Sequence, residues 1–323
     1  MQIMQRLAWA SLLVISVLAS AAQAQTFPTK GLRLIVTFPP GGAADVTGRI
    51  LAEHMTKGLG QPVIVDNRPG GGSVIGYELG ARAPADGHTM LMVWPSFVLG
   101  PALRQGLPYD PLRDFKAVGQ TISLPMAIAI SPSIPAKTIQ ELIALARTKP
   151  GEIAYGTSGA GGVHHIFGEM LNLAAKTSFT HAPYQGEVPA LTSVVGGHLP
   201  MVLVNASAIA PFAKSGKVRA LAVTSAERLD LMPGVPTLRE SGYPDLVALN
   251  WSGIVVPAAT SPAVIARLNV ELVRALRHPE VQEKFRSYGM VALPSTPEQF
   301  GTYLQSESAS FAKVVREANI KVD

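Results

Sequence analysis

The chain has 323 residues, a formal net charge of +5 and no cysteine. The lack of cysteine excludes disulfides, thiolate metal sites and a lipid-anchored cysteine. Only 15% of the residues are charged, and the lysines and arginines are scattered, whereas nucleic-acid binding needs a basic stripe with stacking aromatic side chains. We therefore expect no nucleic-acid partner and a protein with one or two hydrophobic cores of ordinary size.

The first residues have the pattern of a secretory signal. Arg6 supplies a positive n-region, residues 7–19 are nearly all apolar, and Ala22-Gln23-Ala24 has the small residues of a cleavage site. The apolar run is too short for a membrane-spanning helix. We expect residues 1–24 to be a signal peptide and the mature protein to be soluble and exported to the periplasm.

Short apolar runs alternate with helical periodicity along the rest of the chain, which predicts an α/β fold. The predicted strands are residues 32–38, 62–67, 89–93, 126–131, 153–156, 179–182, 201–205, 219–224 and 253–257. The predicted helices are residues 45–59, 73–83, 139–149, 163–175, 187–196, 209–214, 262–277, 279–289 and 297–319.

Two apolar segments, 118–131 and 249–257, lack strong breakers and are predicted to cross between two lobes. Lobe 1 would then be discontinuous, with residues 25–125 and 250–323. Lobe 2 would hold residues 126–249. A cleft between two lobes joined by two strands is a ligand site that can close by a hinge motion.

The most informative motif is Phe38-Pro39-Pro40-Gly41-Gly42-Ala43-Ala44-Asp45, between a predicted strand and a predicted helix. A glycine turn before a helix presents free N–H groups at the positive end of the helix dipole, and these can bind an anion without a cationic side chain. The alternative is an ordinary tight turn. Asp45 either satisfies N–H groups of the first helical turn or accepts a hydrogen bond from a ligand.

A second motif of this kind, Gly156-Thr157-Ser158-Gly159-Ala160-Gly161-Gly162, precedes another predicted helix. It nearly matches the Gly-x-Ser-x-Gly nucleophile elbow of hydrolases, but Ala160 replaces the last glycine. The acid and histidine that must follow the serine are available only as Asp230 or Asp245 and then His278. A secreted serine hydrolase is therefore the minor alternative, and backbone donors to an anion are the favoured interpretation.

Metal and nucleotide motifs are missing from the sequence. His164 and His165 are adjacent, so on a helix they point about 100° apart and cannot share one metal ion. The cluster Gly70-Gly71-Gly72-Ser73 is not followed by Gly-Lys-Ser/Thr, which excludes a P-loop. We predict no metal site and no cofactor. One of the two histidines braces the glycine loop or faces a ligand, unless both are simply packed or solvated.

Together these motifs resemble those of the substrate-binding proteins of tripartite tricarboxylate transporters, the Bug-type extracytoplasmic receptors. The similar segments are residues 33–45, 60–70, 85–89, 107–111, 155–161, 181–186, 219–224, 235–237 and 257–262, and they are spread over the whole mature chain. The resemblance implies a two-lobe, Venus-flytrap periplasmic binding protein of the type II-like class, without a catalytic step. It implies a small carboxylate ligand, for which we expect a dicarboxylate, and delivery to membrane transporter subunits.

The resemblance also implies the residues of the site. In the family, the loops that correspond to residues 38–45 and 157–165 hold a ligand carboxylate from opposite lobes, mainly through backbone N–H groups and ordered water. His165, rather than His164, falls at the family's histidine position. The candidate ligand-binding residues are Thr37, Phe38, Pro40, Gly41, Gly42, Ala43, Asp45, Ser96, Phe97, Ser158, Gly159, Ala160, Gly161, His165, Tyr184, Asn205 and Trp251. None is predicted to be catalytic.

The chain departs from the family pattern at two places. Val204 stands where the family often has an acidic residue, which makes an amino-acid ligand less favoured. Trp94-Pro95-Ser96-Phe97 replaces small polar residues and glycine, so Trp94 and Phe97 are either core residues or the floor for a flatter, aromatic ligand. We expect a monomer. A ligand-sensing accessory protein of a membrane two-component kinase is the alternative function, because it would use the same ligand-binding physics.

Overall fold

The computed structural model describes residues 27–321, so the predicted signal peptide lies outside the described residues. The strands are β1 (Leu32–Val36), β2 (Val63–Asn67), β3 (Thr89–Val93), β4 (Phe115–Ile130), β5 (Ala154–Thr157), β6 (Thr180–Pro183), β7 (Met201–Asn205), β8 (Arg219–Val223), β9 (Leu249–Pro257) and β10 (Val291–Ala292). The helices are α2 (Ala43–Leu59), α3 (Val74–Ala81), α4 (Ser96–Leu103), α5 (Ile139–Thr148), α6 (Val163–Ala175), α7 (Glu187–Val195), α8 (Ala206–Lys214), α9 (Pro262–Arg277), α10 (Pro279–Ser287) and α11 (Pro297–Glu317), and the 3-10 turn η1 spans Gly71–Ser73.

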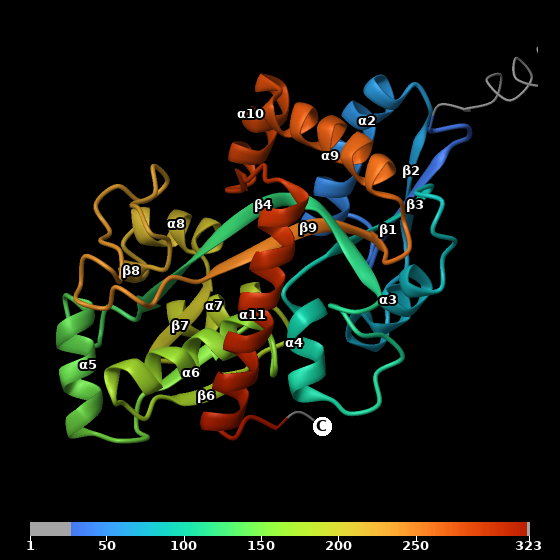
Figure 1. Ribbon diagram of the computed structural model, residues 1–323. Coiled ribbons are helices and arrows are strands. Elements are labelled where there is room, and N and C mark those ends of the chain that lie inside the picture. The colour runs from blue at the N-terminus through green and yellow to red at the C-terminus, as the bar shows by residue number, and fades with distance from the viewer. Residues whose placement is uncertain (1–26, 322–323) are drawn as a thin grey trace, which may run out of the picture.

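The strands form two parallel units that are joined by two long antiparallel strands. Strands β1, β2 and β3 are parallel and build lobe 1, whereas β5, β6 and β7 are parallel and belong to lobe 2. Strand β4 is shared: residues 115–125 pair with β9, and residues 126–130 pair with β7 and β8. Figure 1 shows β4 and β9 side by side through the middle of the molecule. This is the two-lobe α/β architecture that the sequence predicts.

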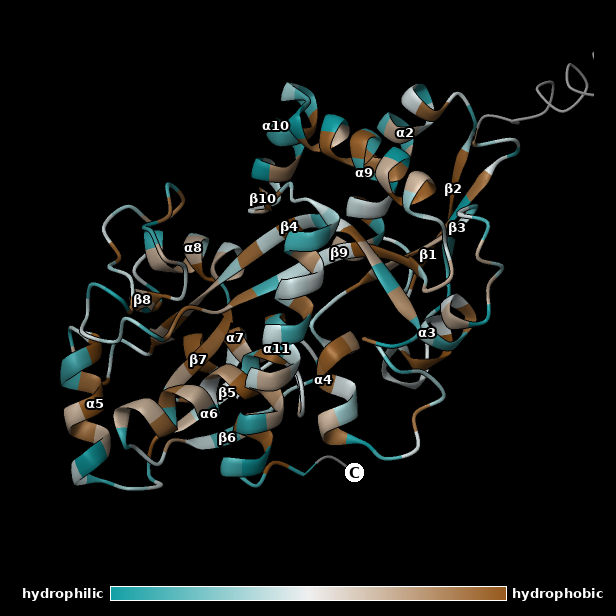
Figure 2. Ribbon diagram, viewed as in Figure 1, coloured by the Kyte–Doolittle hydropathy of each residue, from teal (hydrophilic) through white to brown (hydrophobic). Residues whose placement is uncertain are grey.

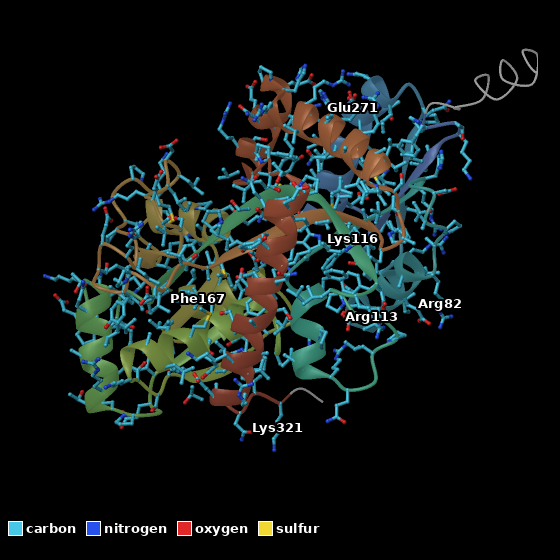
Figure 3. The ribbon with its side chains drawn as sticks, in the orientation of Figure 1. Arg82, Arg113, Lys116, Phe167, Glu271 and Lys321 are labelled. Atoms are coloured by element: carbon cyan, nitrogen blue, oxygen red, sulfur yellow. The ribbon has the colours of Figure 1, made fainter. Side chains whose placement is uncertain are left out.

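Each lobe has its own hydrophobic core, because helices cover the faces of both parallel units. All five residues of β7 are buried, as expected for a parallel strand covered on both sides. Figure 2 shows hydrophobic residues along β7 and mostly hydrophilic residues along α10, which lies at the surface. Figure 3 shows Phe167 inside lobe 2, where it is 1% exposed, while Arg82 and Lys321 project from the surface.

Helix α11 contacts both lobes. It begins with a capping box, in which the Thr296 and Gln299 side chains each accept from the other residue's backbone N–H. It packs on α4 and β4 and also reaches α6 of lobe 2. As a result Ile166 of α6 lies in the same core cluster as Phe300 and Leu304 of α11. The C-terminal helix therefore packs along the junction of the lobes (Figure 1).

Most predicted elements are present, with ends that coincide or differ by at most three residues, whereas β9 begins four residues earlier than predicted. Helix α4 was not predicted, because Gly100 and Pro101 interrupt the helical pattern, and it is packed on α11. Strand β4 begins at Phe115 instead of at residue 126, so it also contains most of the segment 118–131 that is predicted to cross between the lobes. None of the described helices is long and apolar enough to cross a membrane.

Candidate functional site

A cleft of about 820 Å³ lies between the lobes. Residues from both lobes line it, among them nine of the predicted site residues: Phe38, Pro40, Gly42, Ala43, Ser96, Ser158, Gly159, Ala160 and Asn205. No lysine or arginine is among the described residues that line the cleft, and Glu187 is the one acidic residue there. A larger hollow of about 1050 Å³ lies between α8 and the end of α10, but it contains none of the predicted residues. We therefore place the candidate site in the interlobe cleft.

Two helix starts face this cleft with nearly the same backbone geometry. Gly42 precedes α2 with φ −83° and ψ 175°, and Gly162 precedes α6 with φ −85° and ψ 170°. Neither helix has a side-chain cap, so the first N–H groups of both helices are free of side-chain acceptors. The preceding residues, Gly41 and Gly161, have φ values of +88° and +68°, a region that favours glycine. The two starts therefore have matching backbone geometry on opposite lobes, of the kind that can bind an anion.

Each loop is braced by the third residue of its helix. The Gly41 N–H donates to Asp45 Oδ2 at 2.9 Å, and the Gly161 N–H donates to His165 Nδ1 at 3.1 Å. Both acceptors stand four residues after the donor, and neither lines the cleft. The sequence left open whether Asp45 satisfies N–H groups of the first helical turn or accepts from a ligand; in the structure it accepts from the N–H of Gly41, just before the helix, and so braces the loop.

Asp45 is held as a charged carboxylate. Its Oδ2 accepts from Arg49 Nε at 2.9 Å, and its Oδ1 accepts from Asn67 Nδ2 at 3.0 Å. The hydrogen bond from Arg49 is the main cause that lowers the pKa of Asp45. Since three donors converge on this buried group, it ties the α2 loop to the end of β2.

His165 is held as a neutral imidazole. Burial lowers its pKa, and its Nδ1 must be unprotonated to accept from Gly161. The ring stacks on His181 with centroids 3.7 Å apart, and His181 Nε2 lies 2.7 Å from Thr157 Oγ1. Burial is also the main cause that lowers the pKa of His181, to about 4. The α6 loop is thus braced by uncharged groups.

A polar network extends from this loop across the lobe-2 wall of the cleft. Ser158 Oγ lies 2.8 Å from His164 Nδ1, and His164 Nε2 lies 3.4 Å from Asn205 Oδ1. Asn205 Nδ2 then donates to Glu187 Oε1 at 2.5 Å. Burial raises the pKa of Glu187 to about 7 and lowers that of His164 to about 4. Near pH 7, His164 is therefore largely neutral and Glu187 is partly neutral.

Sequence reasoning missed His164 and Glu187. His164 is the neighbour of the predicted histidine, and it is the one that lines the cleft. Glu187 is the first residue of α7, directly after Gly186 with φ +118°, so a glycine turn followed by an acid was the available signal. It bonds to Asn205, and so α7 supplies an acid beside the position where Val204 replaces the family's acidic residue.

The aromatic residues divide between cleft and core. Trp94 lines the cleft and makes an edge-to-face contact with Phe38, with centroids 5.9 Å apart. Phe97 is fully buried among other aromatic rings. Trp251 is also fully buried, and its Nε1 donates to Glu307 on α11. Asn250 lines the cleft instead, since successive side chains of β9 point to opposite faces.

The remaining predicted residues lie outside the cleft lining. Thr37 is 2% exposed at the end of β1, and Tyr184 donates to Ser193 Oγ at 2.8 Å. The histidine required by the hydrolase alternative, His278, lies against His54 in lobe 1, with ring centroids 4.7 Å apart. Ser158 is instead bonded to His164 Nδ1.

Three comparisons relate the chain to known proteins. Protein BugT of Bordetella pertussis is 34% identical over 307 residues, which cover 94% of each chain. A Rhodopseudomonas palustris protein solved with adipate has a TM-score of 0.76 at 28% identity, covering 91% of this chain and 99% of its own. MatC of R. palustris, solved with bound malate, has a TM-score of 0.73 at 28% identity, covering 90% and 100%.

The family profile described as "Tripartite tricarboxylate transporter family receptor" matches residues 47–320. This confirms the predicted resemblance and the two-lobe periplasmic-binding fold. Receptors of this family are periplasmic solute-binding proteins and not enzymes, so the hydrolase alternative is set aside. By its sequence, its fold and its cleft, the chain belongs to the Bug-type receptors of the tripartite tricarboxylate transporter family.

Proposed function

We propose that this protein captures a small dicarboxylate in its interlobe cleft and delivers it to a membrane transporter of the tripartite tricarboxylate type. The observation that carries the proposal is the pair of matched helix starts, at Gly42 and Gly162, that face one cleft from opposite lobes. Two anion sites across a cleft suit a ligand with a carboxylate at each end. Adipate and malate, the ligands of two relatives, have this form.

The polar groups of the cleft support a ligand that is held by hydrogen bonds instead of ion pairs. Ser158, Asn205 and Asn250 line the walls, and no cation is available among the described lining residues. Backbone N–H groups and neutral donors bind a carboxylate without a competing charge. Glu187, partly protonated near pH 7, donates to a ligand oxygen in its neutral form and repels a dianion in its charged form.

The proposed contact set consists of the nine predicted residues in the cleft together with Trp94, Gly162, His164, Glu187 and Asn250. Gly41, Asp45, Gly161 and His165 position the two loops without lining the cleft. The edge-to-face pair of Phe38 and Trp94 forms an apolar wall against which the carbon chain of the ligand packs.

Closure of the lobes is the proposed transport signal. We place the lobe boundaries at residues 125/126 and 249/250, in the shared strands β4 and β9. A ligand that contacts both helix starts favours the closed form, because each contact is complete only when the lobes are together. Residues 1–24 would direct the protein to the periplasm, where the transporter subunits meet it as a monomer.

The test is a thermal-shift screen of the exported protein with mono-, di- and tricarboxylates, aromatic acids and amino acids. A ligand at one hundred times its dissociation constant adds about 2.7 kcal/mol to the free energy of unfolding, a shift of a few degrees in Tm. We expect shifts with four- to six-carbon dicarboxylates. Saturable binding of glutamate or aspartate alone would contradict the ligand class, and silence of the whole panel after unfolding and refolding would contradict the receptor function.

A further inference from the structure

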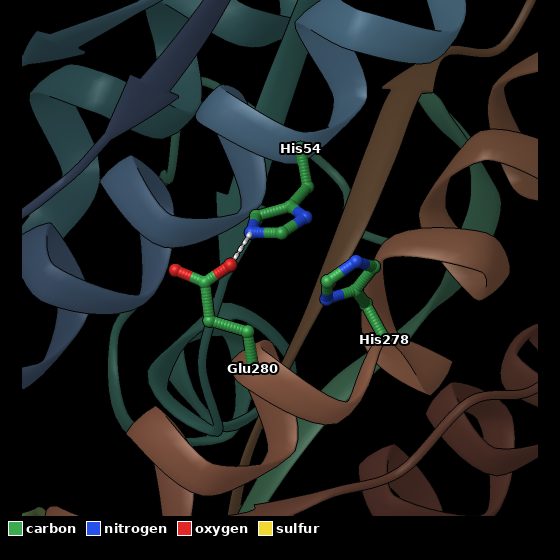
Figure 4. A group of neighbouring side chains, drawn as sticks. All are labelled: His54, His278 and Glu280. Atoms are coloured by element: carbon green, nitrogen blue, oxygen red, sulfur yellow. Dashed lines mark ion pairs between the residues drawn. The ribbon is translucent and has the colours of Figure 1, made fainter.

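A second polar cluster lies in lobe 1, away from the cleft. His54 is on α2, His278 is at the junction of α9 and α10, and Glu280 is in the first turn of α10. Each offers one ligand atom, and these atoms lie within 4.8 Å of one another. Figure 4 shows the His54 ring and the Glu280 carboxylate facing each other, with the His278 ring beside them.

His54 is the buried member of this cluster, and one of its ring nitrogens is unsatisfied. It is 5% exposed, and its Nε2 has no hydrogen-bond partner among the described residues. Glu280 Oε2 is 4.0 Å away, beyond hydrogen-bond distance. Leaving a buried nitrogen unpaired is energetically unfavourable.

We propose that His54, His278 and Glu280 bind a divalent transition-metal ion of the zinc type. Two imidazoles and one carboxylate are a common protein ligand set for Zn²⁺, and the fourth position is then taken by water. The donor atoms must contract to about 3.4 Å from one another around a tetrahedral ion with bonds of about 2.1 Å.

The side chains permit this contraction. Glu280 is exposed and His278 is also at the surface, so both can turn toward the buried His54. Lys284 Nζ holds Glu280 Oε1 at 2.9 Å, and the other carboxylate oxygen, Oε2, is the one that faces His54. The salt bridge and a metal bond can therefore coexist on one carboxylate.

Such an ion would link α2 to the α9–α10 junction. These segments are far apart in the chain and already pack together in lobe 1. Since the site is built from residues outside the cleft lining, metal binding stabilises lobe 1 without contributing to ligand capture. The proposal therefore stands independently of the dicarboxylate function.

The experiment uses protein purified from the periplasmic fraction without a histidine tag and stripped of metal with EDTA. Zn²⁺ is titrated calorimetrically, and Co²⁺ is added separately because its visible absorption reports nitrogen and oxygen ligation directly. The variants are His54→Gln, His278→Gln and Glu280→Gln. His198→Gln is the matched control, since His198 is an exposed histidine in lobe 2.

We expect one equivalent of Zn²⁺ and a rise in Tm for the wild type and for His198→Gln. Loss of a ligand should weaken Zn²⁺ binding at least about tenfold, since even replacing a residue that hydrogen-bonds to a metal ligand typically costs about that much affinity. His278→Gln and Glu280→Gln change surface side chains, so they remain informative if His54→Gln fails to fold. No saturable binding, or equal affinity in both surface variants and the wild type, overturns the proposal.

Discussion

The loops before α2 and α6 have nearly the same backbone geometry, but one is braced by a charged side chain and the other by a neutral side chain. Each places a glycine with positive φ before the helix, and each ties that glycine's N–H to the third helical residue. In the α2 loop the acceptor is the charged Asp45, held by Arg49, and in the α6 loop it is the neutral His165, stacked on His181. The proposed anion site would therefore depend on the free helix N–H groups, and the brace needs only an acceptor at the right distance.

This difference predicts unequal responses to pH. The α2 brace stays ionised down to low pH because the pKa of Asp45 is lowered. The α6 brace and its neighbours need neutral histidines, whose pKa values are lowered by burial. Four experiments test how far the two loops differ.

Blocking either helix start should abolish binding. Gly42→Leu and Gly162→Leu place a side chain at the cleft, and a Cβ at either position meets no atom closer than 3.8 Å. Their φ values of −83° and −85° suit any residue, so the fold should lose only about 1 kcal/mol of stability. We expect affinity for the best ligand of the panel to fall at least about a hundredfold, roughly 2.7 kcal/mol, in titration calorimetry.

Gly234→Leu is the control, since that glycine has open space around it and lies outside the cleft. If only one of the two cleft variants loses affinity, the ligand is held by a single lobe and the matched-site comparison fails.

Removing the braces should rank them. Asp45→Ala deletes the acceptor of three hydrogen bonds, one of them from a cation, whereas His165→Ala deletes one. We expect the free energy of unfolding to fall by about 2–3 kcal/mol for the aspartate and about 1 kcal/mol for the histidine, measured by urea denaturation. Exposed Asp230→Ala should be neutral. Equal losses in the two brace variants would show that the braces are interchangeable.

Glu187 should make ligand capture pH-dependent. Its pKa is raised to about 7, and a bound dianion would raise it further, so binding takes up a proton. The dissociation constant should then increase as pH rises above 7, by up to about tenfold per pH unit, and it should stay flat in Glu187→Gln. Calorimetry of the wild type and the variant between pH 6 and 8.5 measures this. The same slope in both proteins would assign the proton to another group.

Acid should weaken lobe 2 through His164. Its pKa is about 4 in the folded protein and about 6.5 when unfolded, so the unfolded chain binds more protons between these values. The stability that the neutral ring contributes is complete above pH 6.5 and is lost as pH falls toward 4. Near pH 5.5 the loss from His164 is roughly 1 kcal/mol. In the wild type it is offset by a gain of similar or larger size, because Glu187, whose pKa is raised from 4.5 to about 7, takes up a proton in the folded protein.

Urea denaturation measures the free energy of unfolding at pH 7.5 and at pH 5.5. The change between the two pH values should be less unfavourable in His164→Gln than in the wild type. His198→Gln should follow the wild type, because that histidine is exposed. An equal change in His164→Gln and in the wild type would place the acid response elsewhere in the protein.

The α/β class, nearly all helices and strands, and the two helix starts could be predicted from the sequence alone. These depend on local properties: the period of apolar residues, and the glycines that end a strand and begin a helix. Gly41 and Gly161 could be found this way because only glycine readily takes their backbone conformation. The resemblance carried by the motifs then indicated the family and the class of ligand.

Which side chains line the cleft could not be predicted from the sequence, because it depends on the tertiary structure. Asn250 lines it and Trp251 does not, because the pairing of β9 sets which alternate residues face α11. Glu187, on α7, belongs to the site because it is hydrogen-bonded to Asn205 at the end of β7. Such choices depend on how strands and helices pack across long sequence separations, and the pKa values of His164 and Glu187 depend on the burial that this packing produces.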